Sequence, residues 1–293
     1  MNVQTPGPFE RRQIMSKEKL QFQDLNQYLL LKNGNYLYKV PFRDGFAVLK
    51  VYYGSRSAMT YIAGTISNYF QGQTSFMPRA RLANERRCLA IWRNAGFRVF
   101  EIYDDVEVNG LPEGGYMLFE YLPALKFMDY FGDTSIPLEG RMATYRRFLE
   151  EWHRRHNIAV TLREPRLIHE NGDMKHVMIT DEGFLYFDFE MSFRSHKKAR
   201  VEEFVSREIL AYLKSLHKIV GRELFSVFLD ETIDHYPATE FLKNTYTVMF
   251  THPNPVIRLA RWFDRKTDRR AAKPHSKYNV ALQLKNRLDK RHA

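Results

Sequence analysis

Two carboxylates in different settings lie within the stretch "HENGDMKHVMITDEGFLYFDFE", residues 169–190. Asp173 follows a glycine, and Asp188 stands between two phenylalanines at the end of an apolar run. Transfer of a phosphoryl group needs a carboxylate that orients the attacking hydroxyl and cations that neutralise the phosphate charge. With Asp173 in the first role and a metal ion held by Asp188, this one stretch could serve both needs.

A third group, Lys50, completes this minimal set. It ends the run "AVLK" in a predicted strand. Side chains alternate between the two faces of a strand, so Lys50 is expected on the inner face, two places after Val48. Its ammonium is a cation of the kind that phosphate groups require.

The first half of the chain is predicted to form the elements that carry Lys50. Residues 28–54 contain three β-favouring runs separated by Asn33-Gly34-Asn35 and by Arg43-Asp44-Gly45, which predicts an antiparallel meander. Residues 55–78 show no clean period and are expected to form a loop or an irregular insertion. A helix is predicted from Pro78 to Gly96, followed by a strand, a turn and a strand.

The second half is mainly helical and carries the two carboxylates. Residues 138–160 and 201–221 have strong helical periodicity. Between them, "HVMIT" and "FLYFDF" flank the turn Asp181-Glu182-Gly183 and predict a β-hairpin. The expected class is therefore α+β, with a small antiparallel-β part and one helix followed by a larger helical part.

Composition supports a globular protein without a disulfide framework. The 293 residues are 44% hydrophobic, which is enough to fill a substantial core. Cys88 is the single cysteine, so a cysteine-based metal site is excluded and a buried thiol is expected. The N-terminus lacks the apolar core of a secretory signal, and no run of about 18 apolar residues occurs. We expect a cytosolic protein, with Met15 as an alternative start to Met1.

The net charge of +11 predicts a polyanionic partner. Much of the excess lies beyond Arg258, within a basic segment of residues 256–293. Anionic lipid head groups, a phosphorylated glycan and nucleic acid are the candidates, and a solvated basic face without a partner is the alternative. Apolar residues among these arginines favour attachment to an anionic membrane through residues 256–277, unless they pack against the helical part: Val256, Ile257, Leu259, Ala260, Trp262 and Phe263.

The motifs quoted above resemble those of the protein-kinase-like superfamily over residues 30–218. Within it they are more similar to the sugar kinases of the lipopolysaccharide inner core, the Kdo and heptose kinases, than to true protein kinases. The resemblance implies a two-lobe fold that uses ATP and Mg²⁺. The expected segments are a polar tail (1–25), a nucleotide-binding N-lobe (26–122), a C-lobe with the catalytic loop and metal site (123–255) and the basic segment (256–293).

The resemblance also implies a role for individual residues. Asp173 would accept the proton of the acceptor hydroxyl, and His169 would brace the backbone beside it. Asp188 would hold magnesium, with Glu190 as a ligand of a second metal. The residues expected to contact the nucleotide are Lys50 with its partner Glu85, which hold the phosphates, and the backbone from Glu120 to Leu122, which faces the adenine.

Four features depart from the kinase pattern. The glycine-rich loop is reduced to Gly34, and the position of the second magnesium ligand, 173 + 5 = 178, is a methionine. His176 and Asn171 are polar substitutes nearby; His176 is a candidate metal ligand, with a packed or exposed histidine as the alternative. Three residues, instead of one, separate His169 from Asp173. No A-P-E segment follows "DFE", which argues against a protein substrate.

Three functions remain open from the sequence. The first is a kinase that phosphorylates a sugar hydroxyl on an anionic or lipid-linked glycan at the inner face of a membrane. An aminoglycoside-type phosphotransferase is a variant of it, although an acidic acceptor cleft would then be expected. The second is a pseudokinase or regulatory binding module. The third, a nucleic-acid binder, is disfavoured because no RRM, KH or zinc module is found.

Overall fold

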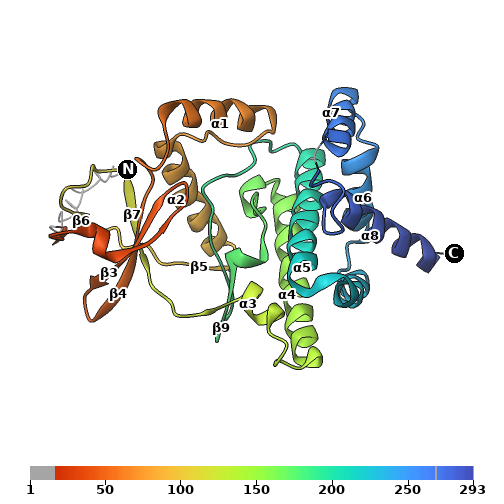
Figure 1. Ribbon diagram of the computed structural model, residues 1–293, viewed down its shortest axis with the longest axis horizontal. Helices are drawn as coiled ribbons and strands as arrows, with labels where there is room; N and C mark the ends of the chain where they lie inside the picture. Colours follow the sequence, from red (N-terminus) through yellow and green to blue (C-terminus); the bar gives the residue numbers. More distant parts are fainter. Residues whose placement is uncertain (1–16, 268, 293) are drawn as a thin grey trace, which may run out of the picture. The chain divides into compact units, whose positions relative to one another are not determined.

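The computed structural model describes residues 17–267 and 269–292, and the chain divides into two compact units (Figure 1). The first contains described residues up to position 55 together with residues 101–121, and the second contains residues 56–100 and described residues from 122 onward. Residues 56–100, which the sequence analysis assigned to the N-lobe, thus belong to the helical unit. Met15 and most of the expected N-terminal tail lie outside the described residues.

The first unit is built on an antiparallel sheet with the strand order β2-β3-β4-β7. These strands are β2 (Leu29–Lys32), β3 (Tyr36–Phe42), β4 (Gly45–Val51) and β7 (Tyr116–Glu120). The turns between the first three strands contain Gly34 at a φ of 77° and Arg43 at a φ of 50°. The predicted meander is confirmed.

Alternating side chains of this sheet form the core of the first unit. Val40, Ala47 and Leu49 are completely buried. A parallel pair of short strands, β1 (Glu18–Leu20) and β6 (Val106–Val108), adds Val106 and Val108 to the same core. A short 3-10 helix, η1 (Leu25–Tyr28), precedes β2.

The second unit contains helices and short strands. The helices of its first part are α1 (Ala58–Phe70), α2 (Pro78–Asn94), α3 (Phe127–Gly132) and α4 (Leu138–Leu162). Two 3-10 turns follow, η2 (Pro165–Leu167) and η3 (Met174–His176). The later helices are α5 (Lys198–His235), α6 (Thr239–Phe250), α7 (Pro255–Thr267) and α8 (Lys277–His292).

The hairpin predicted between the two carboxylates is confirmed. Strands β9 (Val177–Thr180) and β10 (Gly183–Tyr186) are antiparallel neighbours in the sheet order β5-β10-β9-β8. The outer strands are β5 (Arg98–Val99), parallel to β10, and β8 (Leu125–Lys126), antiparallel to β9. Because the two strands are antiparallel, the segment that enters β9 and the segment that leaves β10 lie next to each other.

Helix α1 corrects the expectation of a loop over residues 55–78. Ser57 caps it, because the Ser57 hydroxyl accepts a hydrogen bond from the Thr60 N–H. Within α1 only Tyr61 is buried, whereas Ile62 and Ile66 are exposed to 49% and 54%. The apolar residues of this helix recur at helical spacing, but they face the surface and not a core.

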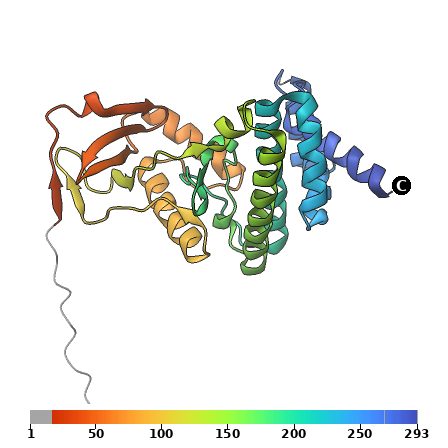
Figure 2. The same ribbon diagram turned by 90° about the horizontal axis from the view of Figure 1, so that it is seen from below.

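Helices α4 and α5 pack side by side (Figure 2), and α5 also contacts η3. Their interface is aromatic, with Phe148, Trp152 and Tyr212 stacked or edge-on. A buried ionic pair crosses it, since Arg155 Nη2 donates to Glu208 Oε1 at 2.7 Å. The buried aromatic contacts and this ion pair together fix the rotation of α5 against α4.

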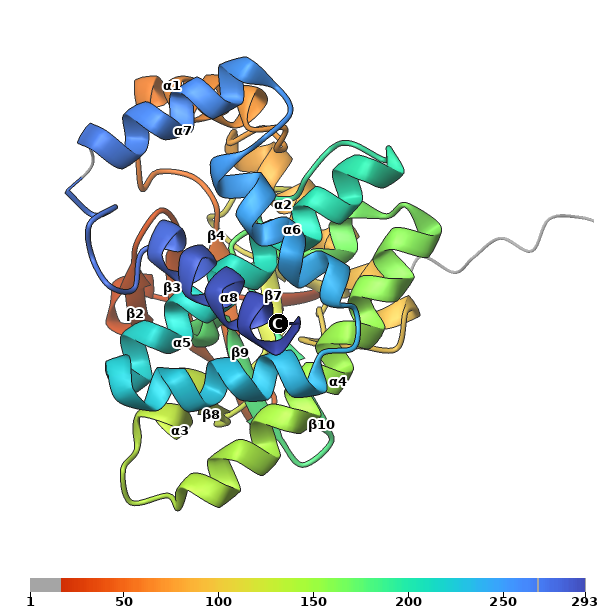
Figure 3. The same ribbon diagram turned by 90° about the vertical axis from the view of Figure 1, so that its right-hand side faces the viewer.

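Helices α6 and α8 cover the far side of α5 (Figure 3). Cys88 is buried in α2, as expected.

Helix α7 has no buried residue, so the alternative in which its apolar side chains pack into the helical part is wrong for Val256, Leu259, Trp262 and Phe263. Among the described residues, no helix combines the length and apolar character needed to span a bilayer.

Candidate active site

Asp173 is held in a defined position by the start of η3 and by α5. Its Oδ1 accepts hydrogen bonds from the Lys175 N–H at 3.0 Å and from the Ser215 hydroxyl at 2.7 Å. Ser215 in turn accepts from the Met174 N–H at 3.1 Å. Within the described part of the chain, Oδ2 of Asp173 has no such donor, so this oxygen is the one suited to accept a proton.

The Asp188 carboxylate receives two side chains from the loop that contains Asp173. Asn171 Nδ2 donates to Asp188 Oδ2 at 3.1 Å, and His176 Nε2 lies 3.2 Å from the same oxygen. Both polar substitutes named from the sequence therefore reach Asp188. The backbone of Asp188 is left-handed, with a φ of 73°, a conformation that non-glycine residues adopt rarely and often at functional sites.

His169 is buried behind Asp188 and joins three elements. Nε2 of His169 donates to the Asp188 carbonyl at 3.3 Å, and Nδ1 lies 2.8 Å from the Tyr212 hydroxyl on α5. Burial, reinforced by the neighbouring His176, lowers the pKa of His169 to about 4. The ring is therefore neutral near pH 7, with the Tyr212 hydroxyl donating to Nδ1.

Helix α2 contacts the segment that follows Asp188. Asn84 Nδ2 donates to the Phe189 carbonyl at 2.9 Å, and the Ser192 hydroxyl donates to Asn84 Oδ1 at 2.7 Å. Arg81 is buried and its Nε donates to Glu190 Oε2 at 2.9 Å, so Glu190 forms an ion pair with α2. Glu85, one turn further along α2, is buried as well.

The residues expected to contact the nucleotide are divided between the units. Lys50 and Glu120 belong to the first unit, and Glu85 and Leu122 belong to the second. Lys50 is buried in the sheet, and its Nζ lies 5.1 Å from the centre of the Tyr52 ring. The Glu120 carboxylate accepts from the Glu101 N–H at 2.8 Å, and the Glu120 N–H donates to the Glu101 carbonyl at 3.1 Å.

The donor set around Asp188 suits a magnesium ion that also binds phosphates. Mg²⁺ prefers oxygen ligands and usually takes one or two carboxylates from the protein, with phosphate and water oxygens completing the octahedron. Asp188 supplies the carboxylate, and Asn171 would orient that carboxylate by donating its amide N–H to Oδ2. His176 Nδ1 lies 3.0 Å from the Asn171 carbonyl oxygen, so the ring is held with Nε2 toward Asp188. In the described residues, no three His, Cys, Asp or Glu side chains converge as a metal cluster.

Asp173 lies on the wall of a cavity of about 880 Å³ in the second unit. The loop of residues 170–173 forms one side of it, and α5 and α7 form the others. Its lining contains more cations than anions: Lys175, Arg200, Arg207, Lys214, Lys218, Arg261 and Lys277 against Glu170, Asp173 and Glu203. This cavity, which we call the basic pocket, suits a negatively charged acceptor.

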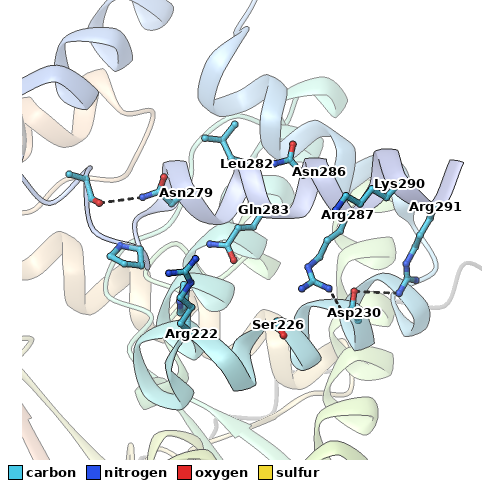
Figure 4. Close-up of a pocket in the computed structure, with 13 residues that line it drawn as sticks. Arg222, Ser226, Asp230, Asn279, Leu282, Gln283, Asn286, Arg287, Lys290 and Arg291 are labelled. Atoms are coloured by element: carbon cyan, nitrogen blue, oxygen red, sulfur yellow. Dashed lines mark hydrogen bonds and ion pairs between the residues drawn. The ribbon is translucent and has the colours of Figure 1, made fainter. Parts of the chain in front are cut away.

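A second hollow lies between α5 and α8 (Figure 4). Its arginines Arg287 and Arg291 pair with Asp230 across the helices. Asp230 is the sole acidic group among its lining residues and is already used in these pairs. The lining residues of this hollow therefore include no carboxylate other than the paired Asp230.

Several functional candidates were not identified from the sequence. Ser215 and the pocket cations of α5 lie in a helix that the sequence predicted from its apolar periodicity, without a role for its polar side chains. A signal was present, because Arg207, Lys214 and Lys218 are spaced by seven and four residues and so share one helix face. Glu170 was also missed: Gln73 donates to it, and burial raises its pKa to about 6.

Comparisons with known proteins show only distant similarity. No protein-family model matches the chain, and no curated protein sequence matches it significantly. Among solved structures, WaaP in complex with acyl carrier protein aligns with a TM-score of 0.41 at 14% identity, covering 82% of this chain and 88% of that one. An apo pseudokinase aligns with a TM-score of 0.37 at 12% identity, covering 93% and 97%. The expected α+β class is confirmed by the order of the elements, since an N-terminal antiparallel sheet precedes a larger, mainly helical region.

Proposed function

We propose that this chain is an ATP- and Mg²⁺-dependent kinase that phosphorylates a sugar hydroxyl on a lipopolysaccharide-like or other anionic glycan. The observation that carries the proposal is the position of Asp173. Its Oδ1 is fixed by Ser215 and Lys175, and its side chain lines the basic pocket. Asn171, on the same wall, connects this pocket to the Asp188 carboxylate.

In the proposed reaction, Asp173 accepts the proton of the acceptor hydroxyl as that oxygen attacks the γ-phosphorus of ATP. The bond from the γ-phosphorus to the bridging oxygen breaks, and ADP leaves. Magnesium bound at Asp188 would neutralise charge on the transferred phosphoryl group and on ADP. His169 supports this arrangement by holding the Asp188 backbone, and Ser215 keeps Asp173 from rotating.

The remaining roles are proposed on the resemblance of the motifs. Lys50 contacts the α and β phosphates with Glu85 as its partner, and the backbone of residues 120–122 contacts the adenine. His176 is a further candidate ligand of the metal at Asp188. Glu190 is proposed to bind a second cation in exchange with Arg81, to which it is paired.

Nucleotide binding is tested by thermal shift with ATP, with and without magnesium. A ligand that binds only the folded state raises the unfolding midpoint, by an amount equivalent to about 2.7 kcal/mol at a hundred times its Kd. Asp188→Ala should abolish the magnesium-dependent part of the shift. Asp181→Ala, which removes an exposed carboxylate from the turn of the same hairpin, should retain it. Equal magnesium-dependent shifts in both variants would contradict the assignment of Asp188.

The second candidate function is a pseudokinase or regulatory binding module. Met178 stands where kinases place a magnesium ligand, and only Gly34 remains of the phosphate loop. Asp173→Asn separates the two functions. A kinase should keep its magnesium-ATP shift in this variant and lose about 10²-fold or more in phosphoryl transfer, whereas a pseudokinase forms no phosphorylated product even in the wild type.

We place the enzyme in the cytoplasm, attached peripherally to an anionic membrane surface through residues 256–277. Helix α7 presents Val256, Leu259, Trp262 and Phe263 at the surface together with three exposed basic side chains, Arg258, Arg265 and Lys266. Such a helix can lie in the head-group region of an anionic bilayer. A nucleic-acid partner is disfavoured, because the sequence contains no RRM, KH or zinc module and basic residues alone give mainly salt-sensitive, non-specific binding.

A further inference from the structure

Three arginines converge on the part of the basic pocket formed by α5 and α7. Arg200 and Arg207 belong to α5, Arg261 belongs to α7, and all three line the cavity. The Arg207 guanidinium lies 4.8 Å from the centre of the Phe193 ring, and its Nη1 donates to the Gln71 carbonyl at 3.5 Å. Packing on the ring and on α1's end therefore holds Arg207 in place.

The positive charge of this cluster is only partly compensated. Glu203 pairs with Arg200 and is also 3.4 Å from His252 Nε2. Burial lowers the pKa of Arg261, and the neighbouring Arg207 lowers it further. Among the described residues, Nη1 of Arg261 is buried without a hydrogen-bond partner. An unsatisfied buried guanidinium N–H is costly, which indicates a missing acceptor.

We propose that Arg200, Arg207 and Arg261 form a subsite for an oxyanion carried by the acceptor, either a phosphate or a carboxylate group. This inference rests on the proposed function, since it assigns the basic pocket to the acceptor. Guanidinium groups bind both oxyanions through paired N–H donors, and they keep their charge when partly buried.

The position of the subsite sets a distance within the acceptor. Ser215, which holds Asp173, is eight residues after Arg207 on α5, or about 12 Å along the helix axis. The oxyanion and the accepting hydroxyl are therefore expected at positions of the acceptor separated by a similar length. Lys214 and Lys218, which line the pocket near Ser215, can contact polar or anionic groups between them.

The test compares two arginines of the same helix. Inorganic phosphate and acetate are titrated by calorimetry into the full chain, into Arg261→Gln and into Arg258→Gln, an exposed residue of α7 outside the pocket lining. We expect Arg261→Gln to weaken phosphate binding about tenfold or more, since it loses a charge-assisted hydrogen bond, and Arg258→Gln to bind as the wild type does. Arg261→Lys, which keeps the charge without the planar fork, should fall between them.

Equal phosphate affinity of Arg261→Gln and Arg258→Gln would overturn the subsite. Tighter binding of acetate than of phosphate would support a carboxylate as the acceptor group, and the reverse a phosphate. The magnesium-ATP thermal shift of Arg261→Gln should equal that of the wild type. If the wild type does not bind nucleotide, the proposed function is wrong, but phosphate binding at the oxyanion site can still be measured.

A separate observation concerns α1, whose exposed face is apolar. Met59, Ile62, Ile66, Tyr69 and Phe70 are between 49% and 83% exposed, and α1 contains no charged residue. Their spacing places them on one side of the helix. Phe70 lines the basic pocket together with Ile257 and Ala260 of α7, and α1 and α7 lie along the same edge of the second unit (Figures 1 and 3).

We infer that α1 is a second helix in contact with an anionic lipid bilayer, on the same face as α7. Charge favours a lipid surface over an apolar protein partner, because Arg194 lies on the Tyr69 ring at 4.5 Å and Arg56 on the Phe76 ring at 5.3 Å, beside the apolar face. Basic side chains around exposed aromatic and aliphatic groups are the pattern of interfacial helices. The basic pocket would then open at the membrane, where a lipid-linked glycan presents its sugars.

Neighbouring residues of α1 provide a matched test. Ile66→Asp places a charge on the apolar face, and Ser67→Asp places the same charge on an adjacent exposed residue turned away from it. In co-sedimentation with vesicles containing phosphatidylglycerol, Ile66→Asp should reduce the bound fraction several-fold more than Ser67→Asp. Equal binding of the two variants, or equal binding to neutral vesicles, would refute the lipid contact. Both positions are exposed, so both variants should fold.

Discussion

At the scale of single residues, the site depends on buried groups that hold exposed ones. Asp188 and Asp173 are partly exposed, while the groups that hold them include the buried His169 and the hydroxyl of Ser215. His169 contacts the Asp188 carbonyl from one side and Tyr212 from the other, so a change in its protonation affects both the loop and α5. The protein's response to acid should report this coupling.

The pKa of His169 predicts a loss of stability at mildly acidic pH. Since the folded state lowers this pKa from 6.5 to about 4, the unfolded chain binds more protons between these values. The stabilisation is complete above pH 6.5 and declines as the pH falls toward 4, by about 2 kcal/mol between pH 7 and pH 5. Buried His156, with a pKa also lowered to about 4, acts in the same direction, and Glu170, with a raised pKa, opposes it.

Urea unfolding at pH 7 and pH 5 measures this effect. The comparison of wild type with His169→Gln cancels the contributions of His156 and Glu170. The variant should be less stable than the wild type at pH 7. Between pH 7 and pH 5, its free energy of unfolding should fall by about 2 kcal/mol less than that of the wild type. If the wild type and His169→Gln lose the same free energy of unfolding between pH 7 and pH 5, His169 does not titrate as described.

At the scale of elements, α5 organises the second unit. It supplies Ser215 to Asp173, Tyr212 to His169 and Glu208 to the buried pair with Arg155. Its first part thus connects the site to the core. At Gly221 the helix bends, with a φ of 78° and a ψ of 173°, and its second part carries the residues that pack against α8.

Glycine substitutions in two helices should have opposite effects on stability. Gly221→Ala forces a side chain into a conformation that only glycine adopts readily, and it should lower the free energy of unfolding by about 1–3 kcal/mol. Gly140→Ala, near the start of α4 where a Cβ meets nothing closer than 4.0 Å, should raise it by up to about 1 kcal/mol. Chemical denaturation checks both, and a stabilising Gly221→Ala would show that the bend is not required.

At the scale of the whole molecule, the structure shows where basic residues that contribute to the net charge of +11 lie. Part of it lines the basic pocket beside Asp173, and part of it lies on α7 among exposed apolar residues. These two sets have different physical consequences. Partly buried guanidiniums are weakly screened and favour a specific oxyanion, whereas exposed cations act on a charged surface over about a Debye length and lose their effect in high salt.

Sequence patterns alone determined the meander of the first unit, the hairpin between the carboxylates and the long helices α2, α4 and α5. Each has a buried face, and burial on one face imposes a period of 2 or 3.6 on the residues. Asp173 and Asp188 could be selected because their spacing across a hairpin is local. Asn171 and His176 were also identified, for they lie within a few residues of these carboxylates along the chain.

Only the tertiary structure decided what lies around Asp173. Ser215 is 42 residues from Asp173, and Arg261 is 54 residues from Arg207, so no local pattern relates them. Their proximity results from the packing of α5 against the loop and of α7 beside α5. Helix α1 was missed although Met59, Ile62, Ile66 and Tyr69 recur at intervals of three and four, because they alternate with polar and glycine residues and face outward, not a core. The sequence determined which chemistry is available, and long-range packing determined where charge and apolar surface meet it.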